Sequence, residues 1–130
     1  LVDPRISVSE GHRMGERARQ RVLEAHPEVA DVLVHIDAEE DQALMSNSAN
    51  LPDRDVLLAH LNHLLGEEAG GIEKTVLHYL GNRVEAEIFV PPQTCLDDAR
   101  MARLEQHIAA QLDKDPYIRS ISLNCRVAPK

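Results

Sequence analysis

A hairpin signal in the middle of the chain is the feature that most constrains its fold. Residues 72–80 and 83–90 alternate apolar and polar side chains, and Gly81-Asn82 separates the two runs. This dipeptide suits a two-residue turn between antiparallel strands, and alternation turns every second side chain toward a core. The second run has its apolar residues on one expected buried face: Val84, Ala86, Ile88 and Val90. We therefore expect an antiparallel strand pair that is covered on one side.

Helix and strand signals stand on both sides of this hairpin. Before it, Pro52 suits a first helical position, leucines recur at helical spacing, and Gly70-Gly71 suits a helix end. After it, Pro91-Pro92 breaks the strand, and Thr94 is expected to cap a helix that has Asp97 and Asp98 in its first turn. The apolar face of that helix consists of Leu104, Ile108 and Leu112.

The chain closes with a further strand. Pro116 ends the preceding helix, and residues 118–127 alternate in character. Their apolar side carries Ile121, Leu123, Cys125 and Val127.

The first third of the chain predicts a helix followed by a strand. Ser7 and Glu10 have the spacing of a capping box, which starts a helix over residues 8–25 with a narrow face of small residues. Pro27 ends this helix, and residues 29–37 (VADVLVHID) alternate as a strand does. Residues 38–50 are acidic and then rich in Ser and Asn, without periodicity, and are expected to form a connecting loop.

The resulting order is helix, then strand, helix, strand, strand, helix, strand. This order predicts an α+β fold, a ferredoxin-like split βαβ sandwich with an additional N-terminal helix. In such a sheet the fourth strand lies beside the first, followed by the third and the second. We expect a single domain over residues 1–130. A faint internal echo of helix, proline and strand suggests an alternative, a degenerate duplication of 1–37 and 51–130 joined by the loop 38–50.

Composition excludes some partners. The 130 residues carry a formal charge of −8 and contain no basic stripe, so nucleic acid is not an expected partner. No apolar run approaches the ~20 residues that cross a bilayer, so this piece does not insert into a membrane itself. Leu1 follows no initiator Met, which leaves room for a parent protein that does span a membrane. Cys95 and Cys125 are distant in the sequence and too few for a disulfide framework, which favours a reducing cytosol.

Histidine is the residue type that points to chemistry. The chain has seven, and neutral imidazole is the commonest ligand for borderline metal ions. His35 and Asp37 share one face of the expected strand, so their donor atoms can converge on one ion, although a wet sheet face has the same pattern. His60 and His63 share a helix face in the same way. The sequence contains none of the common nucleotide-binding or hydrolase motifs, so we do not expect an enzyme.

Two stretches resemble a known family. Residues 2–12 (VDPRISVSEGH) and 23–37 (LEAHPEVADVLVHID) are similar to the cytoplasmic C-terminal domain of cation diffusion facilitator transporters. The family pattern is the "VDP" end of a strand, a helix start that contains a His, and a strand ending in V-H-x-D/E. A weaker similarity covers residues 77–84 (LHYLGNRV), which resemble the family's first hairpin.

The resemblance implies specific metal ligands. Carried over position by position, it assigns His12, His35 and Asp37 as ligands and makes His78 a further candidate. Residues 91–100 parallel the helix start, but Arg100 stands where the His should be. Asn124 and Arg126 likewise replace the His and the acid of the strand. The implied metal is divalent, in the first place Zn²⁺, with Cd²⁺, Co²⁺, Ni²⁺, Fe²⁺ or Mn²⁺ as other ions that such ligands accept.

The implied function is regulatory. The resemblance describes a cytosolic, metal-sensing and dimerising domain of a zinc-type efflux transporter, with a homodimer and the transmembrane domain of the parent protein as partners. Transport itself would lie outside these residues. Two alternatives of similar fold stay open: a metal-independent dimerisation module and a regulatory domain that binds a small molecule.

Overall fold

The computed structural model describes residues 1–38 and 50–126. The chain divides into two compact units, residues 1–43 and 44–130. In the described ranges, no helix combines the length and the apolar character that crossing a membrane requires. The predicted loop over residues 38–50 lies almost wholly outside the described residues, as does Val127.

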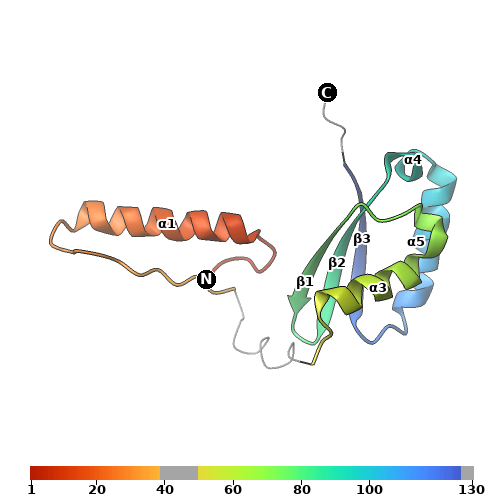
Figure 1. Ribbon diagram of the computed structural model, residues 1–130, viewed down its shortest axis with the longest axis horizontal. Helices are drawn as coiled ribbons and strands as arrows, with labels where there is room; N and C mark the ends of the chain where they lie inside the picture. The colour runs from red at the N-terminus through yellow and green to blue at the C-terminus, as the bar shows by residue number, and fades with distance from the viewer. Residues whose placement is uncertain (39–49, 127–130) are drawn as a thin grey trace. The chain divides into compact units, whose positions relative to one another are not determined.

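The first unit is one helix followed by an extended segment. Helix α1 spans Val8–Ala25, which confirms the predicted bounds, and the Ser7 side chain accepts a hydrogen bond from the Glu10 backbone N–H. The chain then turns at Pro27 and runs back along the helix (Figure 1). The expected strand over residues 29–37 is wrong as a sheet strand. These residues pair with no neighbouring strand among the described residues, and only Val2 and Ala38 form an isolated parallel bridge.

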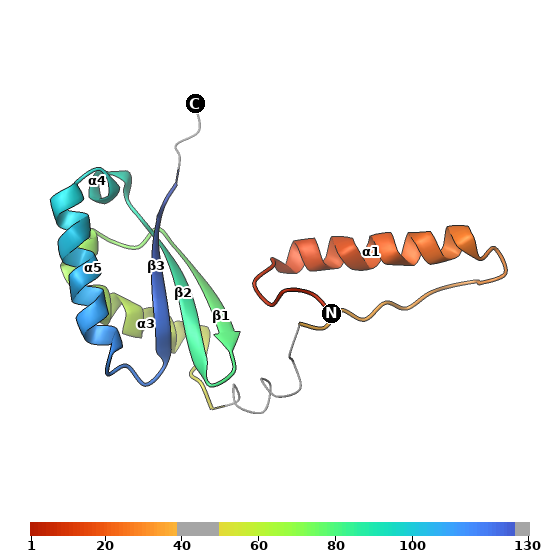
Figure 2. The same ribbon diagram turned by 180° about the vertical axis from the view of Figure 1, so that it is seen from behind.

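The second unit is a three-stranded sheet with helices on one face (Figures 1 and 2). In chain order its elements are α3 (Arg54–Leu65), the 3₁₀ helix η1 (Gly66–Ala69), β1 (Lys74–Leu80), β2 (Arg83–Val90), α4 (Pro92–Cys95), α5 (Asp98–Leu112) and β3 (Ile118–Cys125). β1 and β2 form the predicted antiparallel hairpin. β3 then pairs with β2 in parallel, so the sheet order is β1-β2-β3.

The core of this unit lies between the sheet and helices α3 and α5. The predicted buried face of β2 is confirmed, since all four of its apolar residues are at most 2% exposed. Leucines of α3 and the apolar face of α5 cover it, and Ile118 closes it from β3. The largest fully buried side chains of the helices are Leu57, Leu61, Leu65 and Leu104. At roughly 25 cal/mol per Å² of buried apolar surface, this core is the main source of the unit's stability.

Helix α5 does not begin as the sequence suggested. Its N-cap is Asp97, whose side chain accepts from the Arg100 backbone N–H at 2.9 Å. Thr94 instead lies in the short helix α4, is buried, and donates its hydroxyl to the Ala69 carbonyl at 3.0 Å. The reason is competition: the Ala69 carbonyl at the end of η1 needs a donor, and Asp97 is the better cap three residues later.

The cysteines and the strand order also differ from expectation. Cys95 and Cys125 form a disulfide, with their Cα atoms 6.3 Å apart, because the parallel pairing of β3 brings its last residue to the end of α4. The expected four-strand order is wrong, since residues 29–37 are not part of this sheet. The α+β class, with an additional N-terminal helix, is confirmed, and the arrangement is consistent with a ferredoxin-like fold.

Candidate metal site

The contacts of Gly15 and Arg19 of α1 with the extended segment set the position of His35 and Asp37. A Cβ atom on Gly15 would lie 3.5 Å from Ile36 and 3.8 Å from Val34, so these side chains face the helix at van der Waals distance. Arg19 of α1 also holds the segment through a hydrogen bond of 2.6 Å to Asp31. Because successive side chains of an extended chain point to opposite sides, His35 and Asp37 face away from α1.

His35 and Asp37 are in direct contact. His35 Nδ1 and Asp37 Oδ2 lie 2.9 Å apart, and the two side chains are 81% and 44% exposed. An ionised carboxylate only accepts, so Nδ1 carries the proton of this bond. In the neutral imidazole, Nε2 then holds a lone pair that points to solvent. This is the arrangement in which a carboxylate orients a metal-binding histidine.

His12 does not join this pair. It is exposed on α1, one residue from Gly11, whose Cβ position faces Ile6 and Ile36. His35 and Asp37 lie on the other side of the segment that packs against this helix. Across residues 1–38 and 50–126, no group of three or more His, Cys, Asp or Glu side chains is arranged to hold a metal ion. While the bond between them holds, the pair offers one donor atom, Nε2 of His35, and any further ligand has to come from elsewhere.

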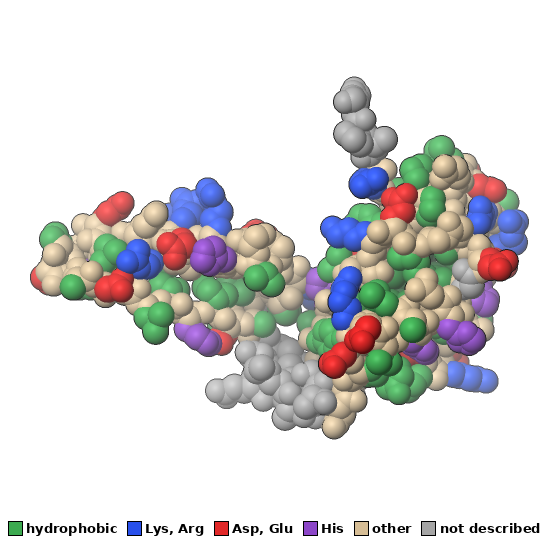
Figure 3. Space-filling model, viewed as in Figure 1, with side chains coloured by type: hydrophobic (Ala, Val, Ile, Leu, Met, Phe, Trp, Pro, Cys, Tyr) green, Lys and Arg blue, Asp and Glu red, His purple; other side chains and the backbone are tan. Residues whose placement is uncertain are grey.

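His78 belongs to the second unit. It lies on β1, and its Nε2 is 2.7 Å from Oε2 of Glu87 on the neighbouring strand β2. Within residues 1–38 and 50–126, four histidines contact a carboxylate in this way: His26, His35, His60 and His78. On the face shown in Figure 3 the histidine side chains surface at several separate places.

His60 has a structural role. Its Nε2 is 2.5 Å from Oδ2 of Asp115, and its ring meets Tyr117 edge to face. Asp115 also accepts the backbone N–H groups of Tyr117 and Ile118, so it fixes the turn into β3. Burial alone would raise the pKa of Asp115, but these hydrogen bonds favour the charged form and hold the pKa below its usual value. His60 is thereby engaged, while its expected neighbour His63 is exposed.

Two further side chains have clear structural partners. His107 Nε2 lies 2.8 Å from the Leu64 carbonyl, which ties α5 to the end of α3. Arg100, which stands where the family has a His, donates from Nε to the Glu68 carbonyl at 2.7 Å. The sequence pointed to neither contact, nor to the role of Asp115. An Asp directly before a proline and three residues before a strand is a signal that such a side chain caps the turn.

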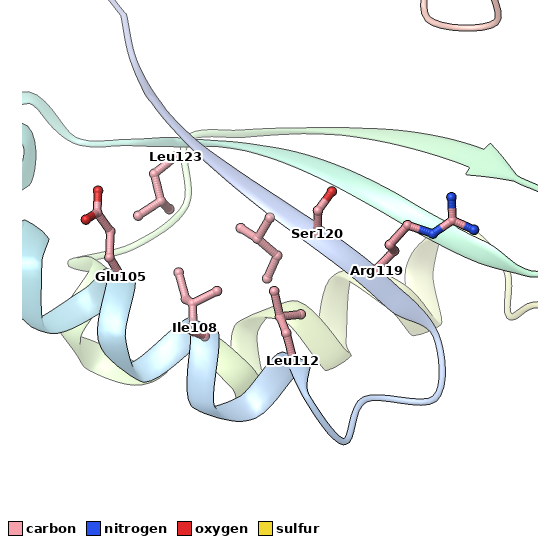
Figure 4. Close-up of a pocket in the computed structure, with 8 residues that line it drawn as sticks. Glu105, Ile108, Leu112, Arg119, Ser120 and Leu123 are labelled. Atoms are coloured by element: carbon pink, nitrogen blue, oxygen red, sulfur yellow. The ribbon is translucent and has the colours of Figure 1, made fainter.

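The cavities of the second unit are shallow. One of about 390 Å³ lies between α5 and β3, where Ile108, Leu112 and Leu123 point toward one another (Figure 4). Glu105 and Arg119 also line it. Another of about 270 Å³ is lined by Glu67, Glu68, Arg100 and Arg103. Neither contains a histidine or a cysteine.

Comparisons with known proteins identify the first part of the chain. Residues 1–39 match the family model described as "Cation efflux protein, cytoplasmic domain". Over 90 residues, 69% of this chain, the sequence is 30% identical to metal tolerance protein C1 of Arabidopsis thaliana, and the chain spans 18% of that relative's length. No solved structure matches. Residues 1–39 are therefore similar to the cytoplasmic domain of cation efflux proteins, as the sequence resemblance implied.

Proposed function

We propose that this chain is the metal-sensing and dimerising cytoplasmic region of a transporter that exports divalent metal ions. The observation that carries the proposal is the exposed His35–Asp37 pair in the segment that matches the efflux family. Zinc is the ion that an imidazole and a carboxylate suit best, and Cd²⁺, Co²⁺, Ni²⁺, Fe²⁺ and Mn²⁺ are accepted by the same donors to differing degrees.

The donor set explains why dimerisation and sensing would be linked. While the bond to Nδ1 holds, Asp37 orients the His35 ring from the side away from Nε2, so each chain supplies one donor, or two if that bond is broken, and structural zinc takes four. A second copy of the chain, related by a two-fold axis, would add the same donors, and His12 could replace water as a further ligand, whereas His78 belongs to the second unit and would serve a separate site. A site completed by a partner releases its ion more readily than a closed site within one chain. That property suits a sensor.

The mechanism would be a population shift. The ion binds the paired arrangement of two copies better than the separate copies, so metal raises the fraction of the paired state. The attached membrane part of the transporter responds to that fraction. In this mechanism the chain itself performs no catalysis.

The second unit is, in this proposal, a degenerate copy of the same helix–strand module. In each unit, a residue before the helix pairs in parallel with a residue after the helix. Val2 pairs with Ala38 in the first unit, and Val90 pairs with Cys125 in the second. Aligned on these bridges, Ser122 and Asn124 take the places of His35 and Asp37, two residues before the pair Asn124 and Arg126 that the sequence alignment assigned. Asn124 Nδ2 even donates to Ser122 Oγ at 3.2 Å, a counterpart of the His35–Asp37 bond without a metal ligand.

Calorimetric titration of zinc into the chelator-stripped chain tests the proposal. We expect saturable binding in the original chain and at least a tenfold weaker affinity in a His12→Ala/His35→Ala double variant, about 1.4 kcal/mol or more. His63→Ala is the matched control, because it removes an exposed imidazole of the second unit. Binding that the double variant retains, or that His63→Ala abolishes, would contradict the assignment.

The main alternative is a dimerisation module that needs no metal. It predicts that the dimer has the same dissociation constant with zinc and with a chelator. The similarity to the cytoplasmic domain of cation efflux proteins is compatible with either function. Sedimentation velocity in the two conditions separates them, because the sensing proposal requires zinc to favour the dimer.

A further inference from the structure

The second unit contains one covalent cross-link outside the proposed metal site. Cys95 is the last residue of α4 and Cys125 the last of β3, and their side chains form a disulfide. Cys95 is half-buried at the edge of the core, whereas Cys125 is exposed. A dissolved thiol or disulfide can therefore reach this pair from the side of Cys125.

The location of the domain makes this bond unusual. The matching family is described as a cytoplasmic domain, and the cytosol keeps protein thiols reduced, so disulfides there are mostly transient. We propose that Cys95 and Cys125 are a reversible thiol–disulfide couple, and that oxidation by a low-molecular-weight disulfide fastens the end of β3 to α4. The inference rests on the cytoplasmic placement in the proposed function, but not on metal binding.

The exchange balances as two successive displacements. The thiolate of the exposed Cys125 attacks a sulfur of the dissolved disulfide, which forms a mixed disulfide and releases one thiolate. The thiolate of Cys95 then attacks the Cys125 sulfur, closes the protein disulfide and releases the second thiolate. The two cysteines lose two electrons and two protons, and the dissolved disulfide becomes two thiols.

The bond adds β3 to an existing network of contacts. Thr94, next to Cys95, donates to the Ala69 carbonyl, and Arg100 donates to the Glu68 carbonyl, so α4 and the start of α5 are already tied to η1. The disulfide joins Cys125, the last residue of β3, to this network. Oxidation should therefore restrain the end of β3 and α4 more than the rest of the sheet.

In the first unit, the start of the helix is held against the end of the extended segment without a covalent bond. There, Ile6 before α1 and Ile36 in the extended segment both approach the Cβ position of Gly11, at 3.6 and 3.9 Å. Asp37 of the proposed metal site follows Ile36 directly. The end of the chain segment after the helix is thus held by an apolar contact in the first unit and by a redox-active disulfide in the second.

The test measures both thiols in the full chain over a series of reduced and oxidised glutathione ratios. Alkylation followed by intact mass spectrometry gives the fraction of protein with the intramolecular bond. We expect both cysteines to lose their reactivity toward the alkylating reagent together, within the range of glutathione ratios found in the cytosol. On oxidation, hydrogen exchange at the end of β3 and in α4 should slow roughly tenfold. Cys95→Ser and Cys125→Ser should each remove this response.

Four results would overturn the inference. The bond could persist at every cytosolic ratio, which would make it a static structural bond, or it could form at none. Oxidation could link two chains instead of closing the bond within one. Zinc could protect both thiols of the reduced chain from alkylation, which would make the pair a metal site. Zinc binding by Cys95→Ser, measured by calorimetry, separates this question from the sensing proposal, because that proposal expects it to equal the original chain's binding.

Discussion

At the scale of single residues, a histidine's partner decides whether it is available for metal. His60 and His107 are each bonded through Nε2 to a group that fixes one element to another, Asp115 in one case and the Leu64 carbonyl in the other. His35 is bonded through Nδ1 to an exposed carboxylate, and its Nε2 remains open. The number of histidines in the sequence therefore says less about metal binding than the atom through which each is held.

Asp115 should be the most costly of these polar residues to remove. Asp115→Ala would leave the Tyr117 and Ile118 N–H groups and His60 without their acceptor in a largely buried site. We expect the free energy of unfolding to fall by about 2–4 kcal/mol at neutral pH. Urea denaturation measures it, and His63→Ala, an exposed position on the same helix as His60, should stay within about 0.5 kcal/mol.

The pH dependence of this loss follows from the sign of the pKa shift. The pKa of Asp115 is lowered in the folded chain, so its contribution is complete above the usual pKa of an Asp and is lost as the pH falls through the folded value. The difference in the free energy of unfolding between the original chain and Asp115→Ala should therefore become smaller as the pH falls. If this difference stays constant down to the acid transition, the charge of Asp115 plays no part in stability.

At the scale of elements, two glycines should respond in opposite directions to alanine. Gly70 has a φ of +70°, and a Cβ there would lie 2.9 Å from the buried Thr94 Oγ1, so Gly70→Ala should destabilise the second unit by about 1–3 kcal/mol. Gly15 lies within α1, and its Cβ would make ordinary contact with Ile36. Gly15→Ala should protect α1 from hydrogen exchange, with about 0.5–1 kcal/mol gained in helix stability. Loss of protection would contradict this packing.

The sequence predicted elements whose signals are local. The bounds of α1, the hairpin turn and the buried face of β2 follow from capping, turn and alternation rules that involve few residues. The strand expected over residues 29–37 failed because alternation describes side chains, whereas a strand also needs a backbone partner. Thr94 failed as a cap because its hydroxyl is used by Ala69, 25 residues earlier. The Cys95–Cys125 bond depends on the parallel register of β3, which no local pattern contains.

The candidate site was likewise predictable in part. The i, i+2 spacing placed His35 and Asp37 on one face, and the structure shows these two side chains bonded to each other. The spacing could not show that Asp37 bonds to Nδ1 of His35. It also could not show that His12 lies exposed on α1, away from His35 and Asp37. The roles of His12, His35, Asp37 and His78 as metal ligands remain predictions.

At the scale of the whole molecule, the two units divide the work in this account. The second unit has the continuous core and the disulfide, while the first has the residues that match the efflux family and the exposed donor pair. A sensor benefits from this division because metal binding at the first unit need not disturb the packing of the second. In the proposed function, regulation of an attached transporter would depend on how copies of the chain pair, which metal would control through His35.

The most direct test of this account is the nitrogen spectrum of the histidine rings during a zinc titration of the full chain. Zinc bound at Nε2 of His35 should shift that resonance strongly in proportion to the added metal. The His60 and His107 rings, held by Asp115 and the Leu64 carbonyl, should remain unchanged and serve as controls within the same sample. If the His35 resonance stays unchanged at saturating zinc, this chain does not sense metal through the site described here.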